Sequence, residues 1–263
     1  MLVQEKKKEA PSGTRSVVRA MEILNSFLMV DQHLTLTDVA IHSGLDKATA
    51  RRFLLTFVEL GYVDYDERTK RYCLGLKVLE LAAALPIRNF REAAYPLMAR
   101  LAEKAKATCF LSVIRGNQAL CVDRVHDPQQ LVQVRHFSVG QFLPLHCGAA
   151  PRLLLAHLPE DRREQILAGD LQAMTPYTIT DRKRLRAICD DIVRRGWEVC
   201  VDDAVVGISA VAVPIRNKSQ QVVAALSLGG LSNDILSGGE PRHLSLLMKC
   251  AEEITAIGAY TGG

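Results

Sequence analysis

The sequence has 263 residues, of which 48% are hydrophobic and 24% charged, and its formal net charge is +4. This composition excludes a chain that is disordered throughout, and no apolar run approaches the roughly 18 residues that a membrane-spanning helix needs. The basic excess is too small to indicate nucleic acid by itself, so the positions of the basic residues decide what they mean.

The N-terminal segment MLVQEKKKEAPSGT is charged and lacks the apolar stretch of a secretion signal. We expect residues 1–13 to form a polar, disordered tail. The seven cysteines form no C-x-x-C pair and mostly sit in apolar runs. This usage predicts reduced, buried thiols in a cytoplasmic protein.

Three helices are predicted between Ser16 and Leu60 from apolar residues spaced three and four apart. Thr35 and Asp38 have the spacing of a capping box at the start of the second helix. Gly44 ends that helix in the manner of a C-terminal glycine, and Asp46 caps the third.

The third helix has two distinct faces. At about 100° per residue, its buried stripe is predicted to comprise Ala50, Phe53, Leu54, Phe57 and Val58. Ala48 and Arg52 fall nearly opposite this stripe, with Thr49 and Arg51 flanking them. Small and basic side chains therefore lie on the outward face of its first two turns.

A short hairpin follows, with strands at residues 62–65 and 71–74. Helix, short helix, turn, longer helix and hairpin form the order of a winged helix-turn-helix, whose third helix enters the major groove. Arginine there can pair with guanine, while the side chains suited to phosphate are those of Lys47, Thr49, Arg68, Lys70 and Arg71. A solvated helix face is the alternative, because residues 1–77 hold 12 Lys and Arg against 10 Asp and Glu. The order of elements favours DNA.

The rest of the chain alternates helices with strands. A helix over residues 75–85 is followed by one over 90–106 and then by strands at 109–114, 120–125 and 131–135. Helices are predicted at 149–157, 160–167 and 182–195, strands at 198–202, 209–215 and 221–228, and Pro241 should open a final helix. Strands in meanders with helices between them indicate an α+β domain with an antiparallel sheet.

The segment HCGAAPRLLLAHL suggests a ligand site. Gly148, Ala149 and Ala150 are small, and Pro151 suits the first turn of a helix. Unpaired N–H groups at such a helix start can seat an anion, with Arg152 adding charge nearby. A helix start packed tightly against the sheet is the alternative.

Several stretches, taken in order, resemble the IclR family of bacterial transcriptional regulators. In the N-terminal half they are SVVRAMEILNSF, LTDVAIHSGLDKATARRFLLTFVELGYV and RYCLGLKVLELA, and in the C-terminal half FLPLHCGAAPRLLLA, RRGWEVCVDDAVVGISAVAVPIRN and VVAALSLGGLS. The resemblance implies a winged helix-turn-helix domain over residues 14–75, a linker helix over 76–88 and a GAF-like effector-binding and oligomerisation domain over 89–263. It also implies homodimers, often paired into tetramers, that bind double-stranded promoter DNA of a catabolic or metabolic operon as repressor or activator.

The same resemblance implies where a small-molecule effector binds. The family's pocket positions fall here on Leu131, Val132, Ala149, Ala150, Cys200, Asp202, Ala210, Ser227 and Gly229. The Gly-Lys common in relatives is Pro151-Arg152 here, a frequent polar residue is Ala210, and a second serine is Gly229. With fewer hydroxyls the pocket is more apolar, which favours an aromatic or longer-chain carboxylate over a small oxoacid.

Three other functions compete with this interpretation. Cys147 beside His146 could serve a cysteine-dependent hydrolase, but adjacent residues point in different directions and no G-x-S-x-G motif occurs. A metal site could gather Cys147, Cys200, His136 and His146, although no zinc-like spacing is present. Winged helices also serve as protein-interaction modules. We expect a regulator that is not an enzyme and needs no cofactor.

Overall fold

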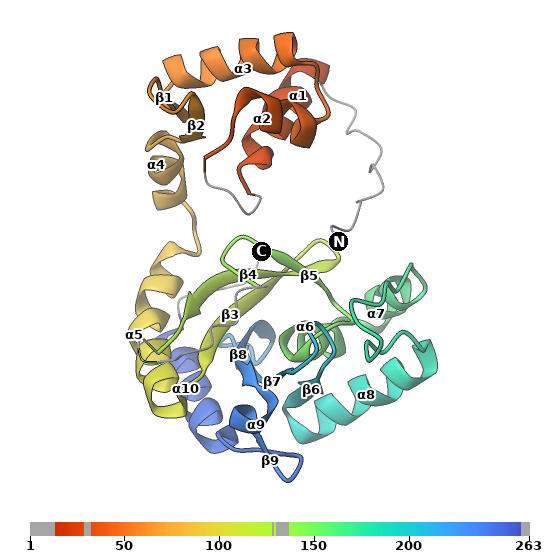
Figure 1. Ribbon diagram of the computed structural model, residues 1–263. Helices are drawn as coiled ribbons and strands as arrows, with labels where there is room; N and C mark the ends of the chain where they lie inside the picture. The colour runs from red at the N-terminus through yellow and green to blue at the C-terminus, as the bar shows by residue number, and fades with distance from the viewer. Residues whose placement is uncertain (1–13, 29–32, 128, 130–136, 259–263) are drawn as a thin grey trace. The chain divides into compact units, whose positions relative to one another are not determined.

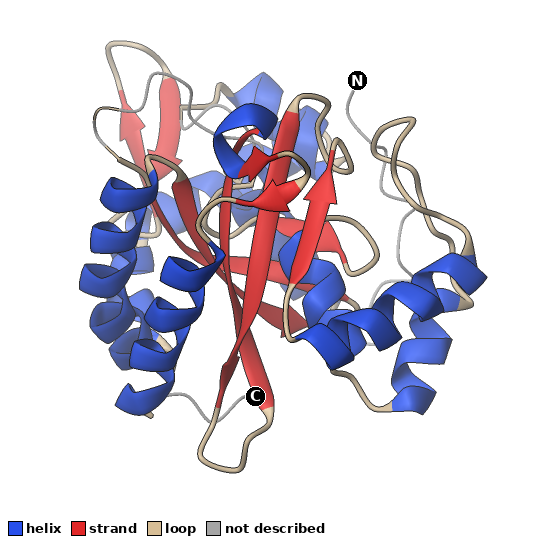
Figure 2. Ribbon diagram, turned by 90° about the horizontal axis from the view of Figure 1, so that it is seen from below, coloured by secondary structure: helices blue, strands red, loops and turns tan. Residues whose placement is uncertain are grey.

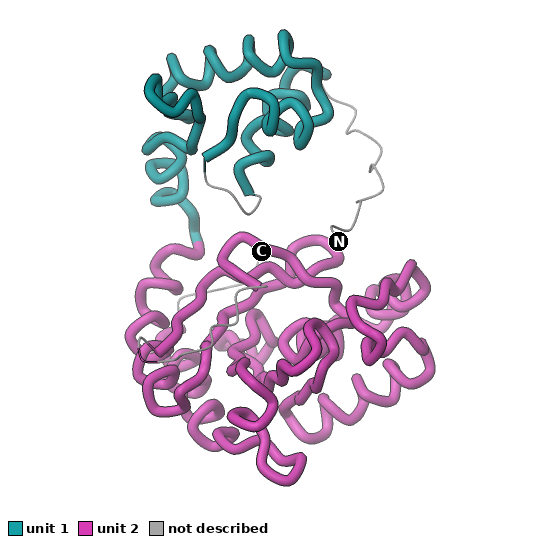
Figure 3. The backbone as a smooth tube through the Cα atoms, viewed as in Figure 1, with its two compact units in different colours: residues 1–86 teal, residues 87–263 magenta. Residues whose placement is uncertain are grey.

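The computed structural model describes residues 14–28, 33–127, 129 and 137–258 (Figure 1). The chain divides into two compact units, residues 1–86 and 87–263 (Figure 3). Each unit buries a hydrophobic cluster of its own, so each packs as a separate domain. None of the described helices is long and apolar enough to cross a membrane.

Residues 1–86 form a winged helix-turn-helix. Three helices precede an antiparallel hairpin and a short fourth helix, in the order α1 (Arg15–Ser26), α2 (Leu36–Ser43), α3 (Lys47–Glu59), β1 (Val63–Asp66), β2 (Arg71–Leu74) and α4 (Lys77–Ala83). The core takes apolar side chains from all three helices and from the hairpin, among them Ile23, Val39, Leu54 and Val63. This packing fixes the outward face of α3.

The local signals around the turn between α2 and α3 are confirmed. The Thr35 side chain accepts a hydrogen bond from the Asp38 N–H, and Asp38 accepts one from the Thr35 N–H, which completes the capping box. Gly44 adopts φ +67°, a left-handed conformation that favours glycine. The Asp46 carboxylate accepts a hydrogen bond of 2.9 Å from the Thr49 N–H at the start of α3.

Residues 87–263 are built on a six-stranded antiparallel sheet with strand order β5-β4-β3-β8-β7-β6. The strands are β3 (Thr108–Arg115), β4 (Gln118–Val125), β5 (Phe142–Pro144), β6 (Glu198–Val201), β7 (Ile208–Arg216) and β8 (Val222–Leu231). The helices are α5 (Arg88–Ala105), α6 (Ala149–Ala156), α7 (Glu160–Leu167), α8 (Arg182–Arg195), α9 (Ser232–Ile235) and α10 (Leu244–Ile257), and β9 (Leu236–Ser237) pairs with β10 (Glu240–Pro241). The predicted α+β class with an antiparallel sheet is confirmed.

Helices cover both faces of this sheet (Figure 2). One core cluster joins α5 and α10 to side chains of β3, β4, β7 and β8. A second cluster joins α6, α7 and α8 to the opposite face, where Ala212 and Ala225 pack beneath α6. The chain passes from β5 into α6, so the start of α6 lies over the sheet.

The structure differs from the predicted elements in several places. Pro241 does not open the last helix, because it pairs with Leu236 in the β9–β10 hairpin and α10 begins at Leu244. Strand β5 and helix α9 were not predicted, and α4 is shorter than the helix expected over residues 75–85. The strand expected at 131–135 lies outside the described residues.

Candidate DNA-binding surface and effector pocket

The outward face of α3 carries the side chains that the sequence analysis assigned to DNA. Lys47, Ala48, Arg51 and Arg52 are exposed. Ala50 and Leu54 are fully buried on the other side, and Phe53, Phe57 and Val58 pack against the same cluster. The first two turns of α3 therefore present two arginines and one small residue to the outside.

Thr49 already has a local partner. It is half-buried, and its hydroxyl donates a 2.7 Å hydrogen bond to the Asp46 carboxylate. Its main contact therefore holds the start of α3.

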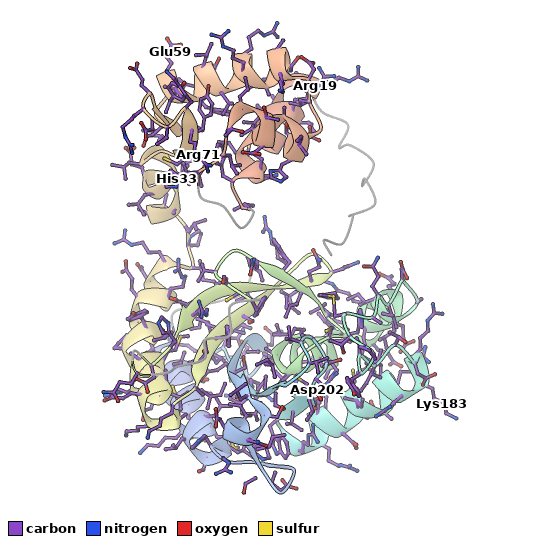
Figure 4. All side chains as sticks on the ribbon, viewed as in Figure 1. Arg19, His33, Glu59, Arg71, Lys183 and Asp202 are labelled. Atoms are coloured by element: carbon purple, nitrogen blue, oxygen red, sulfur yellow. The ribbon has the colours of Figure 1, made fainter. Side chains whose placement is uncertain are left out.

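The hairpin contributes further exposed basic side chains, those of Arg68, Lys70 and Arg71. Arg71 Nη1 donates a 2.9 Å hydrogen bond to the carbonyl oxygen of His33, and the two residues lie side by side in Figure 4. The Lys70 ammonium lies 6.0 Å from the centre of the Tyr65 ring. These contacts hold two of the three cations close to the wing surface.

The second unit contains a pocket at the start of α6. Six of the predicted effector residues line it, namely Ala149, Ala150, Cys200, Ala210, Ser227 and Gly229. Cys200, Ala210 and Gly229 pair directly across β6, β7 and β8, which places them in one row on one face of the sheet. A Cβ at Gly229 would lie 3.2 Å from the Phe110 ring, so glycine leaves room for that ring.

The remaining walls of the pocket are largely apolar, and apart from Gly148 and Pro151 their residues were not predicted. They come from Phe110, Phe137, Leu143, Ala204, Val205, Ile208 and Ser209, with Gly148 and Pro151 at the helix start. The rings of Phe110 and Phe137 stand 5.9 Å apart between centroids. Phe110 pairs with Ser227 across β3 and β8. This pairing brings its ring to the pocket, and the pairing of strands cannot be read from the sequence.

Ser227 offers a hydroxyl to the pocket. The residue is 4% exposed, and in the part of the chain that the structure describes this hydroxyl has no hydrogen-bond partner. The hydroxyl of Ser209, by contrast, donates to Ser232 at 2.8 Å. Ser227 is therefore the side chain in this wall with spare hydrogen-bonding capacity.

Asp202 does not line the pocket. It adopts φ +58°, and its carboxylate accepts a 2.6 Å hydrogen bond from the Gly207 N–H. Figure 4 shows it in the loop beyond β6. The other two predicted wall residues, Leu131 and Val132, lie outside the described residues.

Arg152 has a different role from the one predicted. Instead of supplying charge to a ligand it is buried, 3% exposed, with Nε 2.8 Å from Glu198 and Nη1 2.6 Å from Asp203. The Asp203 carboxylate also accepts a 2.6 Å hydrogen bond from the Gly148 N–H. The ion pairs of Arg152 with Glu198 and Asp203 were not predicted, because these residues lie far from Arg152 along the chain.

Burial and neighbouring charges shift the pKa values of Arg152 and Glu198 in opposite directions. Burial lowers the pKa of Arg152, but the carboxylates of Glu198 and Asp203 raise it above its usual value. The pKa of Glu198 is raised because its burial outweighs the two arginines beside it. The arginine keeps its proton and compensates both buried carboxylates.

The cysteine–histidine pair does not form a nucleophile and base. Cys147 is fully buried, its thiol donates to the Asp203 carbonyl oxygen at 3.5 Å, and burial raises its pKa far above the usual value. His146 Nε2 is hydrogen-bonded to the Gln172 carbonyl oxygen at 2.9 Å. Among the described residues no group of three or more His, Cys, Asp or Glu side chains could hold a metal ion, and His136 lies outside them.

A winged helix-turn-helix with exposed arginines on its third helix, joined to a sheet domain with an internal pocket, defines a ligand-responsive DNA-binding protein. Comparison with known families agrees with this class. Residues 16–67 match the IclR helix-turn-helix domain, and residues 82–256 match the C-terminal domain of the bacterial transcriptional regulator IclR. The chain belongs to the IclR family of bacterial transcriptional regulators.

Individual relatives are similar over nearly their full length. The Pca regulon regulatory protein of Pseudomonas putida is 30% identical over 247 residues, which are 93% of this chain and 84% of that protein. The crystal structure of an IclR transcriptional regulator from Alicyclobacillus acidocaldarius has a TM-score of 0.81 at 27% identity and covers 93% of this chain and 98% of its own. An IclR homologue from Microbacterium hydrocarbonoxydans, solved with 4-hydroxybenzoate, has the same fold, with a TM-score of 0.80 at 24% identity over 92% of this chain and 98% of its own.

Proposed function

We propose that α3 reads base edges in the major groove of a promoter and that Lys47 and the wing contact the DNA backbone. The exposure of Arg52 opposite the buried Ala50 and Leu54, with the exposed Arg51 flanking it, carries this proposal. Arginine donates two parallel hydrogen bonds to guanine, which gives sequence preference. Arg68, Lys70 and Arg71 supply phosphate contacts, which position the protein without reading sequence. Thr49 contributes indirectly, because its hydrogen bonds with Asp46 hold the start of α3 beside the DNA backbone.

The DNA-binding assignment is tested with the full-length protein on its own upstream region and on random duplex. Arg52→Ala should reduce the preference for the specific site by about 1–3 kcal/mol, whereas Lys47→Ala should weaken binding to both duplexes equally and flatten the salt dependence. Fluorescence anisotropy at several salt concentrations measures both effects. Equal losses on the two duplexes for Arg52→Ala would remove it from the base-reading set. Failure of the wild type to prefer any duplex would favour a protein-interaction module instead.

The regulator is proposed to act as a homodimer, and pairs of dimers would give a tetramer. In α4 and the residues that flank it, large apolar side chains are exposed, with Leu76 77% and Leu79 66% accessible. A second copy of this segment would cover these leucines, because removing exposed apolar side chains from water is favourable in free energy. A two-fold dimer binds two half-sites in inverted order, so the selected operator should be a pseudo-palindrome. A regulator that binds promoter DNA is proposed to act in the bacterial cytoplasm.

The effector is proposed to be an aromatic carboxylate held in the pocket at the start of α6. The N–H group of Ala150 has no acceptor within its own helix, and a helix start favours an anion. The neighbouring Ala149 N–H is hydrogen-bonded to the Cys200 sulfur. Arg152 compensates the charge of Asp203, which would otherwise repel a carboxylate at this place. The Ser227 hydroxyl can donate to the same group or to a ring substituent.

The walls favour a ring over a small oxoacid. Phe110 and Phe137 stand against Leu143 and Ile208, and an aromatic ring beside them removes apolar surface from water on both partners. An acid of two carbons fills little of the pocket and leaves this surface hydrated. The effector class follows from this apolar lining.

Calorimetry with benzoate, 4-hydroxybenzoate and glyoxylate tests the effector class. The two aromatic acids should bind, and Ala210→Leu, which fills the floor of the pocket, should weaken them by about tenfold or more. DNA binding in the absence of acid should stay unchanged in that variant and so serves as the control for folding. Binding of glyoxylate without binding of the aromatic acids would contradict the proposal.

No catalytic step is part of this function. The Cys147 thiol is buried and protonated, and His146 is bonded to a backbone carbonyl rather than to the thiol. A thiol in this state is a poor nucleophile. Steady turnover of a thioester that Cys147→Ala abolishes would reinstate the hydrolase.

A further inference from the structure

Leu55 is an exposed aliphatic side chain in the middle of the outward face of α3. It is 54% exposed, although its neighbour Leu54 is fully buried. With Ala48, Arg51 and Arg52 it forms the spacing i, i+3, i+4, i+7. A homeodomain reading helix presents its base-contacting side chains at this same spacing.

Helical geometry places Leu55 between the two arginines. At about 100° per residue, it lies about 20° from Ala48 around the axis, with Arg51 on one side and Arg52 on the other. Any duplex that both arginines reach in the major groove therefore also faces Leu55. The far end of this face is marked by Glu59, an exposed residue at the last position of α3 (Figure 4), whose carboxylate is repelled by the phosphates. Leu55 is thus the last apolar residue of the face before this acidic end.

The chemistry of the groove identifies what an aliphatic side chain can read there. The edges of the bases present hydrogen-bond donors and acceptors, and thymine alone adds a methyl group at C5. Leucine makes no hydrogen bond with its side chain, but it buries apolar surface against that methyl group. We propose that Leu55 contacts the C5-methyl group of a thymine in each half-site and so adds a thymine preference beside the positions read by the arginines. This inference rests on the proposed placement of α3 in the major groove.

The test removes one methyl group from the DNA at a time. Duplexes that bind best are first enriched from a random pool with the full-length wild-type protein. Each thymine of the consensus is then replaced by deoxyuridine, which pairs identically but lacks the methyl group. Affinities are measured for the wild type, for Leu55→Ala, and for Leu60→Ala as the matched control. Leu60 is also exposed, 56% accessible, at the C-terminal cap of α3, and it lies about 120° away from Ala48 around the axis.

At one thymine per half-site, deoxyuridine should weaken the wild type and Leu60→Ala by about fourfold, the effect of one methyl group returned to water. Leu55→Ala should be insensitive to deoxyuridine at that thymine and unchanged in its response at every other one. Methyl dependence that is identical in all three proteins would overturn the inference while leaving DNA binding intact. If the wild type enriches no sequence, the proposed placement of α3 fails and this inference fails with it. Unchanged thermal unfolding of Leu55→Ala excludes misfolding as the cause.

Discussion

Arg152 carries its guanidinium group into the interior of residues 87–263, between Glu198 and Asp203. An isolated buried ion is strongly unfavourable, so the partners decide whether such a residue can be accommodated. Glu198 is also bonded to Arg195, which stacks on the Trp197 ring at 4.2 Å. The ion pairs therefore join Asp203, Arg152 and Glu198 to the exposed Arg195 at the end of α8.

Removing the central charge should destabilise this unit. Arg152→Met leaves two buried carboxylates without their shared partner, and the free energy of unfolding should fall by about 3–5 kcal/mol. Chemical denaturation followed by the fluorescence of Trp197 measures the loss. The loss should be smaller at acid pH, because protonation removes the uncompensated charges.

The matched control is Arg186→Met. Arg186 makes an ion pair of 2.6 Å with Glu164, but both side chains are exposed. Water screens such a pair, so the change should be much smaller. Equal losses in the two variants would show that burial of the Arg152 network adds nothing to stability.

At the scale of elements, α2 and α3 begin at side-chain caps, and these caps orient the surface that we propose faces DNA. Hydrogen bonds from the Thr49 backbone and hydroxyl lower the pKa of Asp46 below its ordinary value of 3.8. Hydrogen bonds from the Thr35 side chain and backbone lower the pKa of Asp38 in the same way. A carboxylate at a helix start accepts orphan N–H groups and interacts favourably with the helix dipole.

These caps predict how the stability of residues 1–86 changes with pH. Because the folded-state pKa of Asp46 lies below its unfolded value, its stabilising effect is fully present above about pH 4 and is lost as the pH falls through the folded pKa. Asp46→Asn keeps a capping oxygen that does not titrate, so below pH 4 its stability should decline less steeply than that of the wild type. Circular dichroism melts between pH 2.5 and about 7 measure this difference. Identical slopes would show that Asp46 does not titrate through the cap.

At the scale of the whole molecule, the surface for DNA lies in residues 1–86 and the pocket in residues 87–263. An effector changes DNA affinity only if it binds more tightly to one arrangement of the DNA-binding units than to another. Any such preference is reciprocal, so operator DNA must change the affinity for the effector by the same factor. The chain connects the two units through α4 and the residues up to Arg88, which is also where the exposed leucines of the proposed dimer contact lie.

Much of the fold could be predicted because its signals are local. The capping box of Thr35 and Asp38, the left-handed Gly44 and the cap at Asp46 depend on residues within a few positions of one another. The outward face of α3 follows from helical periodicity alone. Pro241 shows the limit of such rules, since proline suits a helix start but here pairs with Leu236 in a hairpin.

Only some of the residues that line the candidate pocket could be predicted from the sequence. Ala149 and Ala150 follow from a helix start, and Cys200, Ala210, Ser227 and Gly229 came with the family resemblance. The assignment of Asp202 failed because a local hydrogen bond from the Gly207 N–H holds its carboxylate in the loop beyond β6. The free charge expected of Arg152 failed because Glu198 and Asp203 pair with it from distant parts of the chain. Phe110 was missed because only the alignment of β3 with β8 brings its ring beside Ser227.

The sequence by itself therefore determined the class of protein, the winged helix-turn-helix and the exposed face of α3, because periodicity, caps and turns act between near neighbours. Only the tertiary structure decided the chemistry of the pocket. Arg152 meets Glu198 and Asp203 from more than 40 positions away, and burial turns its charge from a ligand contact into a compensated part of the core. Such pairings depend on strand register and on exclusion of water, which are properties of the folded chain.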